Sequence, residues 1–180
     1  MIEILPNWHP VFVHFTVALL FTAAVLFWVG WAVREWPLGG TILTVAHWML
    51  WIGAGLTIAT VAAGFYAINT VAHPDAAHAP MENHHDWAIG TAILWWAIAL
   101  WDGWQVKKGR AVALPFLAAL VIASGFLAVT AYKGGEVVYR YGAGVEAVPS
   151  SGSGHMHESV PMPMNGNGHM DDPHGSNHMH

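Results

Sequence analysis

Histidine and methionine are the side chains of this chain with the clearest capacity for chemistry. The 180 residues include 13 His and 8 Met but no Cys. Without thiols, disulfides, c-type haem attachment, iron–sulfur clusters and thiolate zinc sites are excluded. Imidazole, thioether and carboxylate groups therefore remain as the strong metal ligands, and neutral imidazole suits haem iron, copper, zinc and nickel.

The densest group of these ligands lies at the C-terminal end. Residues 149–180 are rich in Gly, Ser, Pro and Asn, lack aromatic residues, and contain six His and five Met. Such a composition cannot bury enough apolar surface to fold, so we expect a disordered tail. Thioether binds soft Cu(I) and imidazole binds both oxidation states of copper, which favours copper over zinc or nickel. The alternative is a solvated low-complexity tail whose His are incidental. The candidate copper ligands are His155, Met156, His157, Met162, Met164, His169, Met170, His174, His178, Met179 and His180.

A second group of histidines borders long uncharged segments. His9 and His14 stand at the start of the first such segment, and His84 and His85 precede the third. If these ends meet in a bundle, two imidazoles suffice as axial ligands of a haem b. We take His14 with His84 or His85 as the candidate haem ligands and His9 as a candidate metal ligand. The alternative is that these His are interfacial residues with hydrogen-bonding roles only.

Three further polar residues stand in or after the uncharged segments. Arg140, after the last uncharged segment, could bind a haem propionate, another carboxylate or a lipid phosphate. His47 has no second His on its side of the membrane, so we expect it to be structural. Asp102 is the only charge within the third segment and is expected about one turn from the interface.

The uncharged segments are the elements that must position these ligands. The chain is 55% hydrophobic and only 9% charged, whereas a soluble domain carries about 25% charged residues. A membrane-spanning helix needs about 20 apolar residues, and four segments meet that length without a polar face. We therefore predict an all-α integral membrane protein, a four-transmembrane-helix bundle with a disordered C-terminal tail. The predicted helices cover about 11–33, 41–68, 87–106 and 111–132 of a domain 1–148, which the tail 149–180 follows.

An even number of spans places both termini on one side of the lipid bilayer. The connections on the opposite side hold four basic residues and the tail side holds two. Because basic residues favour the cytoplasmic side, we predict a bacterial inner-membrane protein with both termini in the periplasm. The 11 Trp also suit the membrane interface, where one edge of the indole is apolar and the other wet.

Two motifs bracket nearly the whole membrane part. Residues 7–20 read Asn-Trp-His-Pro-Val-Phe-Val-His-Phe-Thr-Val-Ala-Leu-Leu, and residues 134–145 read Gly-Gly-Glu-Val-Val-Tyr-Arg-Tyr-Gly-Ala-Gly-Val. Both resemble the end motifs of a bacterial membrane family, domain of unknown function 2231. Thr16 stands where that family usually has Pro, and the tail lies outside the resemblance.

The resemblance implies a four-helix membrane domain with no settled activity. Members are sometimes joined to c-type cytochrome modules, which implies redox work at the outer membrane face. A c-type cytochrome, or another respiratory or copper membrane protein, is then the expected partner. By position the resemblance carries over His9 and His14, Tyr139 with its neighbouring glycines, and a His that opens the third helix, either His84 or His85.

Three classes of function fit these residues. A copper-binding protein would capture metal with its tail, and a b-type haem subunit would pass electrons at the periplasmic face. A structural subunit would instead pack its Trp-rich helices against partner membrane proteins. No phosphate loop, nucleophile with a base, or pair of intramembrane carboxylates supports an enzyme. The net charge of −5, without a basic cluster, argues against nucleic acid. We take a metal-linked role at the periplasmic face, copper-binding or redox, as the working interpretation.

Overall fold

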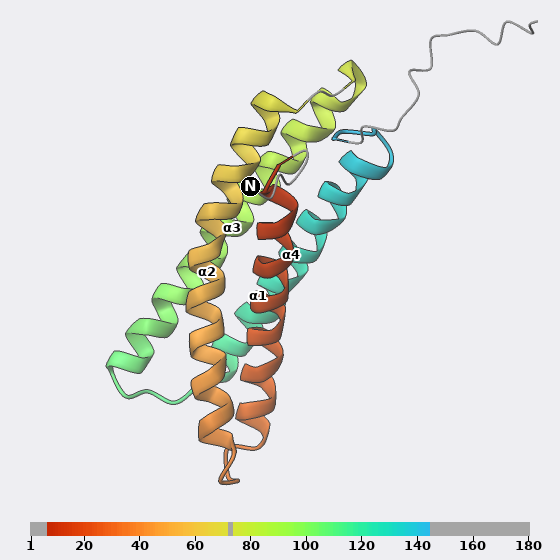
Figure 1. Cartoon of the computed structure of the whole chain (residues 1–180). Coiled ribbons are helices and arrows are strands. Elements are labelled where there is room, and N and C mark those ends of the chain that lie inside the picture. Colours follow the sequence, from red (N-terminus) through yellow and green to blue (C-terminus); the bar gives the residue numbers. More distant parts are fainter. Residues whose placement is uncertain (1–6, 72–73, 145–180) are drawn as a thin grey trace, which may run out of the picture. The chain divides into compact units, whose positions relative to one another are not determined.

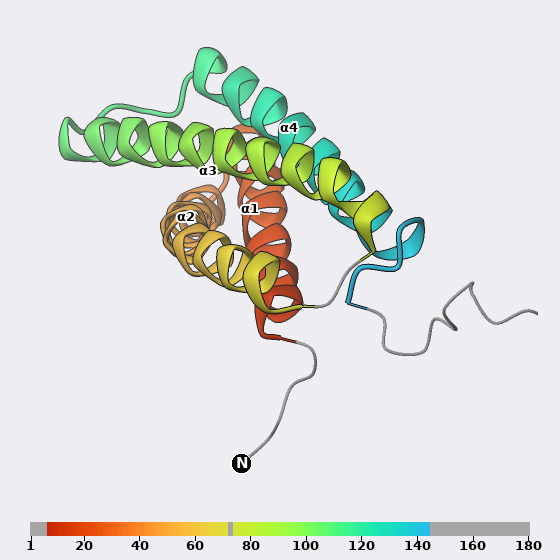
Figure 2. The ribbon, with the colours of Figure 1, turned by 90° about the horizontal axis from the view of Figure 1, so that it is seen from above.

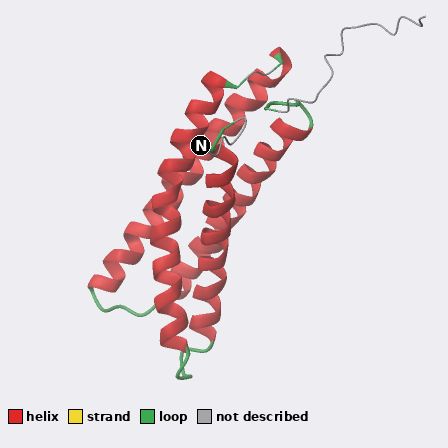
Figure 3. Cartoon of the chain, in the orientation of Figure 1, coloured by secondary structure: helices red, strands yellow, loops and turns green. Residues whose placement is uncertain are grey.

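A computed structural model describes residues 7–71 and 74–144, and these form helices without any strand (Figure 1, Figure 3). In chain order the elements are α1 (His9–Ala32), α2 (Gly39–Thr70), the short 3-10 helix η1 (Asp75–Ala77), α3 (His78–Lys107) and α4 (Leu114–Tyr139). All of them belong to the first of two units, Met1–Val148, and the second unit is Pro149–His180. The four long helices agree in number with the prediction.

The helices extend further at the tail side than the apolar segments predict. α3 begins at His78 rather than at 87, because polar residues continue the helix ahead of its apolar part. α4 runs to Tyr139 rather than to 132, through the glycine pair that begins at Gly134. The chain turns only beyond α4, where Gly142 and Gly144 have φ values of 66° and 75°, a conformation that glycine adopts without steric cost.

Two helical hairpins, α1–α2 and α3–α4, make up the bundle. α1 packs against α2 and α4, and α3 packs against α4 and α2, so α1 and α3 are diagonal partners. Seen from above, the second hairpin lies obliquely across the first (Figure 2). The connections 33–38 and 108–113 share one end, here called the loop-side end (Figure 1). The first turn of α1, η1 and the last turn of α4 share the other, the tail-side end (Figure 1).

Large apolar side chains cover the outside of the bundle as well as its interior. Trp95 and Phe116 are fully buried, whereas Ile58, Ile93 and Val121 are more than half exposed. An exterior this apolar is what contact with lipid requires. By length and composition α1, α2 and α4 could each cross a membrane. α3 is less apolar, because it carries five Trp and a buried carboxylate.

The two hairpins share one pattern of buried residues. The buried residues of α1 and α3 differ by 75 in residue number. Those of α1 are Thr16, Leu20, Ala23, Ala24, Phe27 and Gly30. Those of α3 are Thr91, Trp95, Ile98, Ala99, Asp102 and Gln105. Adding 70 to the buried Ala46, Leu50, Gly53 and Thr57 of α2 gives the buried Phe116, Leu120, Ala123 and Leu127 of α4. The second hairpin therefore repeats much of the burial pattern of the first. Residues matched in this way are called equivalent below.

Candidate functional site

His9 is held at the start of α1 through both its backbone and its ring. Its backbone N–H donates to Asn7 Oδ1 at 2.8 Å, which satisfies one of the free amides of a helix N-terminus. The ring Nδ1 lies 3.0 Å from the backbone carbonyl of Thr60 on α2. Because a carbonyl only accepts, Nδ1 carries the proton and Nε2 has the lone pair. Gly64 makes room for the ring, since a Cβ there would lie 3.1 Å from His9 Cε1.

His84 occupies the equivalent position on α3. The backbone carbonyl of Thr130 on α4 is its hydrogen-bonding neighbour, and a Cβ at Gly134 would lie 2.9 Å from His84 Cε1. Burial, and then the charge of the nearby His9, hold the pKa of His84 below its ordinary value, so the ring is neutral at neutral pH. Its Nδ1 is buried, and no described residue hydrogen-bonds to it. In the Nε2–H tautomer this atom offers a lone pair inside the bundle.

A pair of threonines lies two helical turns beyond each of these histidines. Thr16 Oγ1 and Thr60 Oγ1 are 2.7 Å apart, and so are Thr91 Oγ1 and Thr130 Oγ1. The Thr60 hydroxyl donates to the backbone carbonyl of Leu56 at 2.9 Å, so Thr16 must be the donor in the first pair. Each pair joins the two helices of one hairpin and fixes the helix positions beneath the imidazole. We call His9 and His84 together the twin-histidine site.

His14 lies away from this site. It is exposed, and its Nδ1 lies 2.6 Å from the backbone carbonyl of Pro10 in its own helix. A separation of five residues turns the helix by about 140° from His9, so the two imidazoles cannot share a face. Of the two histidines in the first motif, the structure therefore brings His9, and not His14, beside His84.

Of the remaining candidates of the membrane part, His85 has a buried Nε2 to which no described residue hydrogen-bonds, and Arg140 pairs with a nearby carboxylate. The His85 ring stands edge-on to Phe65 with centroids 4.3 Å apart, and its Nδ1 lies 3.8 Å from Asp86 Oδ1. Arg140 is exposed and donates to Glu136 Oε1 at 2.8 Å, so the carboxylate that it pairs with belongs to the preceding turn of the chain. The copper ligands predicted between His155 and His180 lie outside the described residues, and that prediction stays a prediction.

In the described part of the chain, no three His, Cys, Asp or Glu side chains come together in a way that could hold a metal ion. A metal centre built from the described residues of the tail-side end would therefore have at most two imidazoles as its protein nitrogen donors. Two such donors are enough for linear Cu(I) or for the axial positions of a haem iron.

His47, which has no second His on its side of the membrane, pairs with a carboxylate instead. Its Nδ1 lies 2.9 and 2.8 Å from the two carboxylate oxygens of Asp102, joining α2 to α3. Asp102 is 1% exposed, and the ring of Phe27 packs edge-on against His47 with centroids 5.0 Å apart. No spacing in the sequence connects His47 with a carboxylate 55 positions away, so this pair becomes visible only in the folded chain.

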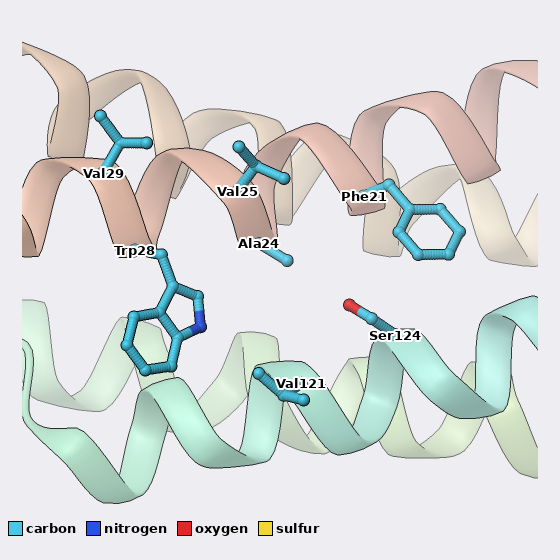
Figure 4. A pocket seen from close by; sticks show the side chains of 7 residues that line it. All are labelled: Phe21, Ala24, Val25, Trp28, Val29, Val121 and Ser124. Carbon is cyan, nitrogen blue, oxygen red and sulfur yellow. The ribbon is translucent and has the colours of Figure 1, made fainter.

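An apolar groove of about 360 Å³ runs between α1 and α4 (Figure 4). Phe21, Trp28 and Val121 line it, and Ser124 presents a buried hydroxyl to which no described residue hydrogen-bonds (Figure 4). Trp51 stands at the position equivalent to Val121, where it packs against the core of the bundle. The groove therefore lies where α4 has Val121 and α2 has the larger Trp51 at the equivalent position.

Sequence spacing alone could have found the twin-histidine site. Seven residues separate His9 from Thr16, and seven separate His84 from Thr91. Four separate Thr60 from a glycine, and the same spacing recurs at Thr130. The repeat is hidden from ordinary inspection because most other equivalent positions differ in residue type while sharing burial.

The model of a family of predicted membrane proteins, DUF2231, matches residues 6–147 of the chain. That match confirms the resemblance carried by the motifs at 7–20 and 134–145. No curated protein and no solved structure matches the chain.

Proposed function

This chain belongs to the DUF2231 family of predicted membrane proteins, and from that starting point we propose that it binds a copper ion at the twin-histidine site. The observation that carries the proposal is the pair of imidazoles itself. They come from diagonal helices, and each has a ring nitrogen with a lone pair. Metal-binding His commonly donate their other N–H to a backbone carbonyl, which fixes the tautomer and the ring, as His9 does toward Thr60.

Copper is favoured by the chemistry of the surrounding ligands. Cu(I) accepts two imidazoles without further ligands and also binds thioether sulfur. Met81 lies one turn before His84 on α3, on the same side of the helix, and is a candidate third ligand. The tail supplies more His and Met, which suits a segment that captures the ion and passes it to the bundle. The metal would hold α1 to α3 across the tail-side end.

The topology that we propose has α3 as a fourth span. Its segment 87–106 contains one charge, which is buried, and α3 exposes Ile93 and Leu100 by more than 60% each. Those side chains need lipid or a partner helix around them. With basic residues concentrated at the loop-side end, the twin-histidine site faces the periplasm of a bacterial inner membrane.

The test is an anaerobic Cu(I) titration of the full-length protein in detergent, against a chromophoric chelator. A full-length variant whose tail His are Asn and whose tail Met are Leu isolates the bundle site. We expect it to bind one Cu(I) per chain, and to lose that ion in His9→Asn or His84→Asn. His14→Asn is the matched control and should keep it. Copper that is unaffected by His9→Asn and His84→Asn would refute the bundle site.

The same samples distinguish copper from haem b. Optical spectra of protein expressed with ample haem, oxidised and then reduced, would show a Soret band if the two imidazoles hold a haem iron. A Soret band lost in His84→Asn would replace the copper proposal with a b-type cytochrome. A colourless protein that binds Cu(I) supports copper.

A further inference from the structure

The His47–Asp102 pair lies in the half of the bundle nearer the loop-side end, and nothing in the proposed copper site uses it. Both carboxylate oxygens face one imidazole N–H, at 2.9 and 2.8 Å. The Asp102 side chain is 1% exposed and the His47 side chain is 21% exposed. A carboxylate withdrawn from solvent, in a bundle whose exterior is apolar, is costly unless it is paired.

The positions equivalent to this pair in the other hairpin are apolar. The residue equivalent to Asp102 is Phe27, and the residue equivalent to His47 is Leu117; both are fully buried. Two buried apolar side chains thus stand on α1 and α4 at the positions where α2 and α3 carry an imidazole and a carboxylate. Replacing a buried ion pair by apolar residues is often neutral or stabilising, so the polar version calls for a role other than packing.

Aromatic side chains lie around the imidazole of this pair. From α1 the neighbour of His47 is the ring of Phe27, and from α2 it is Trp51, with centroids 6.1 Å apart. α4 contributes Phe116, which packs against Phe27. Along α3, Lys107 is the first charged residue after Asp102, more than one turn on, and it is exposed. Among the described residues, the side-chain hydrogen bonds and the ion pair of His47 and Asp102 join these two residues to each other.

We infer that His47 and Asp102 form a reversible proton-binding site that exchanges with the loop side of the membrane. The bound ligand is a proton. In the loaded state the imidazole carries protons on both nitrogens against the carboxylate, or the carboxyl group carries the second one. His47 is the group through which the proton enters, because part of its ring is exposed while Asp102 is sealed. No redox partner or metal is involved, so the inference stands or falls independently of the copper site.

The test follows the two groups separately in the full-length protein in detergent, from about pH 4 to about pH 9. Nitrogen-15 NMR of labelled imidazoles follows His47, whose signal is the one missing from His47→Leu. Infrared difference spectra follow the carboxyl C=O band that Asp102→Asn removes. We expect a titration of His47 that moves in Asp102→Asn, together with a carboxyl or carboxylate band that changes over the same pH range as His47.

Two results would overturn the inference. Constant signals from both groups over the whole range would make the pair a fixed structural contact. A His47 titration that is identical in Asp102→Asn would show that the two groups do not share the proton. The double variant His47→Leu with Asp102→Phe reproduces the other hairpin and should fold while losing both signals. If it unfolds, the isosteric Asp102→Asn still decides between the outcomes.

Discussion

His84 lies directly against the backbone of Gly134, closely enough that a Cβ at that position would come within 2.9 Å of its ring. His9 and Gly64 repeat the relationship in the other hairpin, at 3.1 Å. Each imidazole therefore fills the space that a missing side chain leaves on the partner helix. Both glycines lie inside α-helices, so they are not needed for a turn. They are needed because the histidine ring lies between the two helices and leaves no room for a Cβ.

Gly134→Ala should displace the His84 ring. The added methyl group must be accommodated by a shift of the imidazole or of α4, at a cost of about 1–3 kcal/mol, reduced by the better helix propensity of Ala, about 1 kcal/mol. Thermal unfolding in detergent measures the net effect. Gly125→Ala in the same helix is the control, because nothing lies within 4 Å of its added Cβ. An equal or greater loss in Gly125→Ala would contradict the proposed contact.

The two threonine pairs should couple with similar energies. Interhelical hydrogen bonds of this kind in membrane bundles average about 0.6 kcal/mol, with a maximum near 1.7 kcal/mol. Double-mutant cycles on unfolding free energy, using Thr16→Val with Thr60→Val and Thr91→Val with Thr130→Val, give each coupling. Because the pairs are equivalent, we expect the two values to agree within about 0.5 kcal/mol. Coupling in only one cycle would argue against the equivalence of the two pairs.

Acid should destabilise the metal-free protein through His84. Its pKa is lower in the folded state than in the unfolded chain, chiefly because of burial, so the unfolded state binds more protons between the two values. The stability contributed by neutral His84 is therefore complete when the pH is above the pKa of the unfolded chain, about 6.5. This stability falls as the pH decreases from that pKa to the lower pKa of His84 in the folded state. Unfolding midpoints measured between about pH 7 and pH 5 should decrease less in His84→Gln than in wild type.

His14→Ala should change little. The side chain is exposed and bonded only to the preceding turn of its own helix, and surface substitutions of this kind stay within about 0.5 kcal/mol. His9→Ala, at the start of the same helix, should cost more, because it leaves the space opposite Gly64 unfilled. Paired thermal unfolding measurements compare them. A larger effect from His14→Ala would favour the haem ligand first expected from the sequence.

The number of helices could be predicted from the sequence, because each uncharged segment of sufficient length can be recognised independently of the others. The ends of the helices could be predicted less well. Helix α3 starts at His78 in polar sequence, and α4 continues through Gly134, because backbone hydrogen bonding and helix packing, rather than apolarity, maintain these turns. The motifs that identify the family are also local, and reading them required only the order of residues.

Which side chains meet was decided by the tertiary structure. From the sequence, His14 was the candidate haem ligand and His9 a candidate metal ligand, and only the direction in which α1 presents its faces turns His9 to Thr60 and His14 outward. His47 had no visible partner, because its carboxylate belongs to a different hairpin. Composition and spacing thus determined a helical membrane protein with its histidines gathered toward one end. Helix rotation and the packing of the two hairpins, which depend on many buried residues at once, decided which of those histidines face the interior of the bundle.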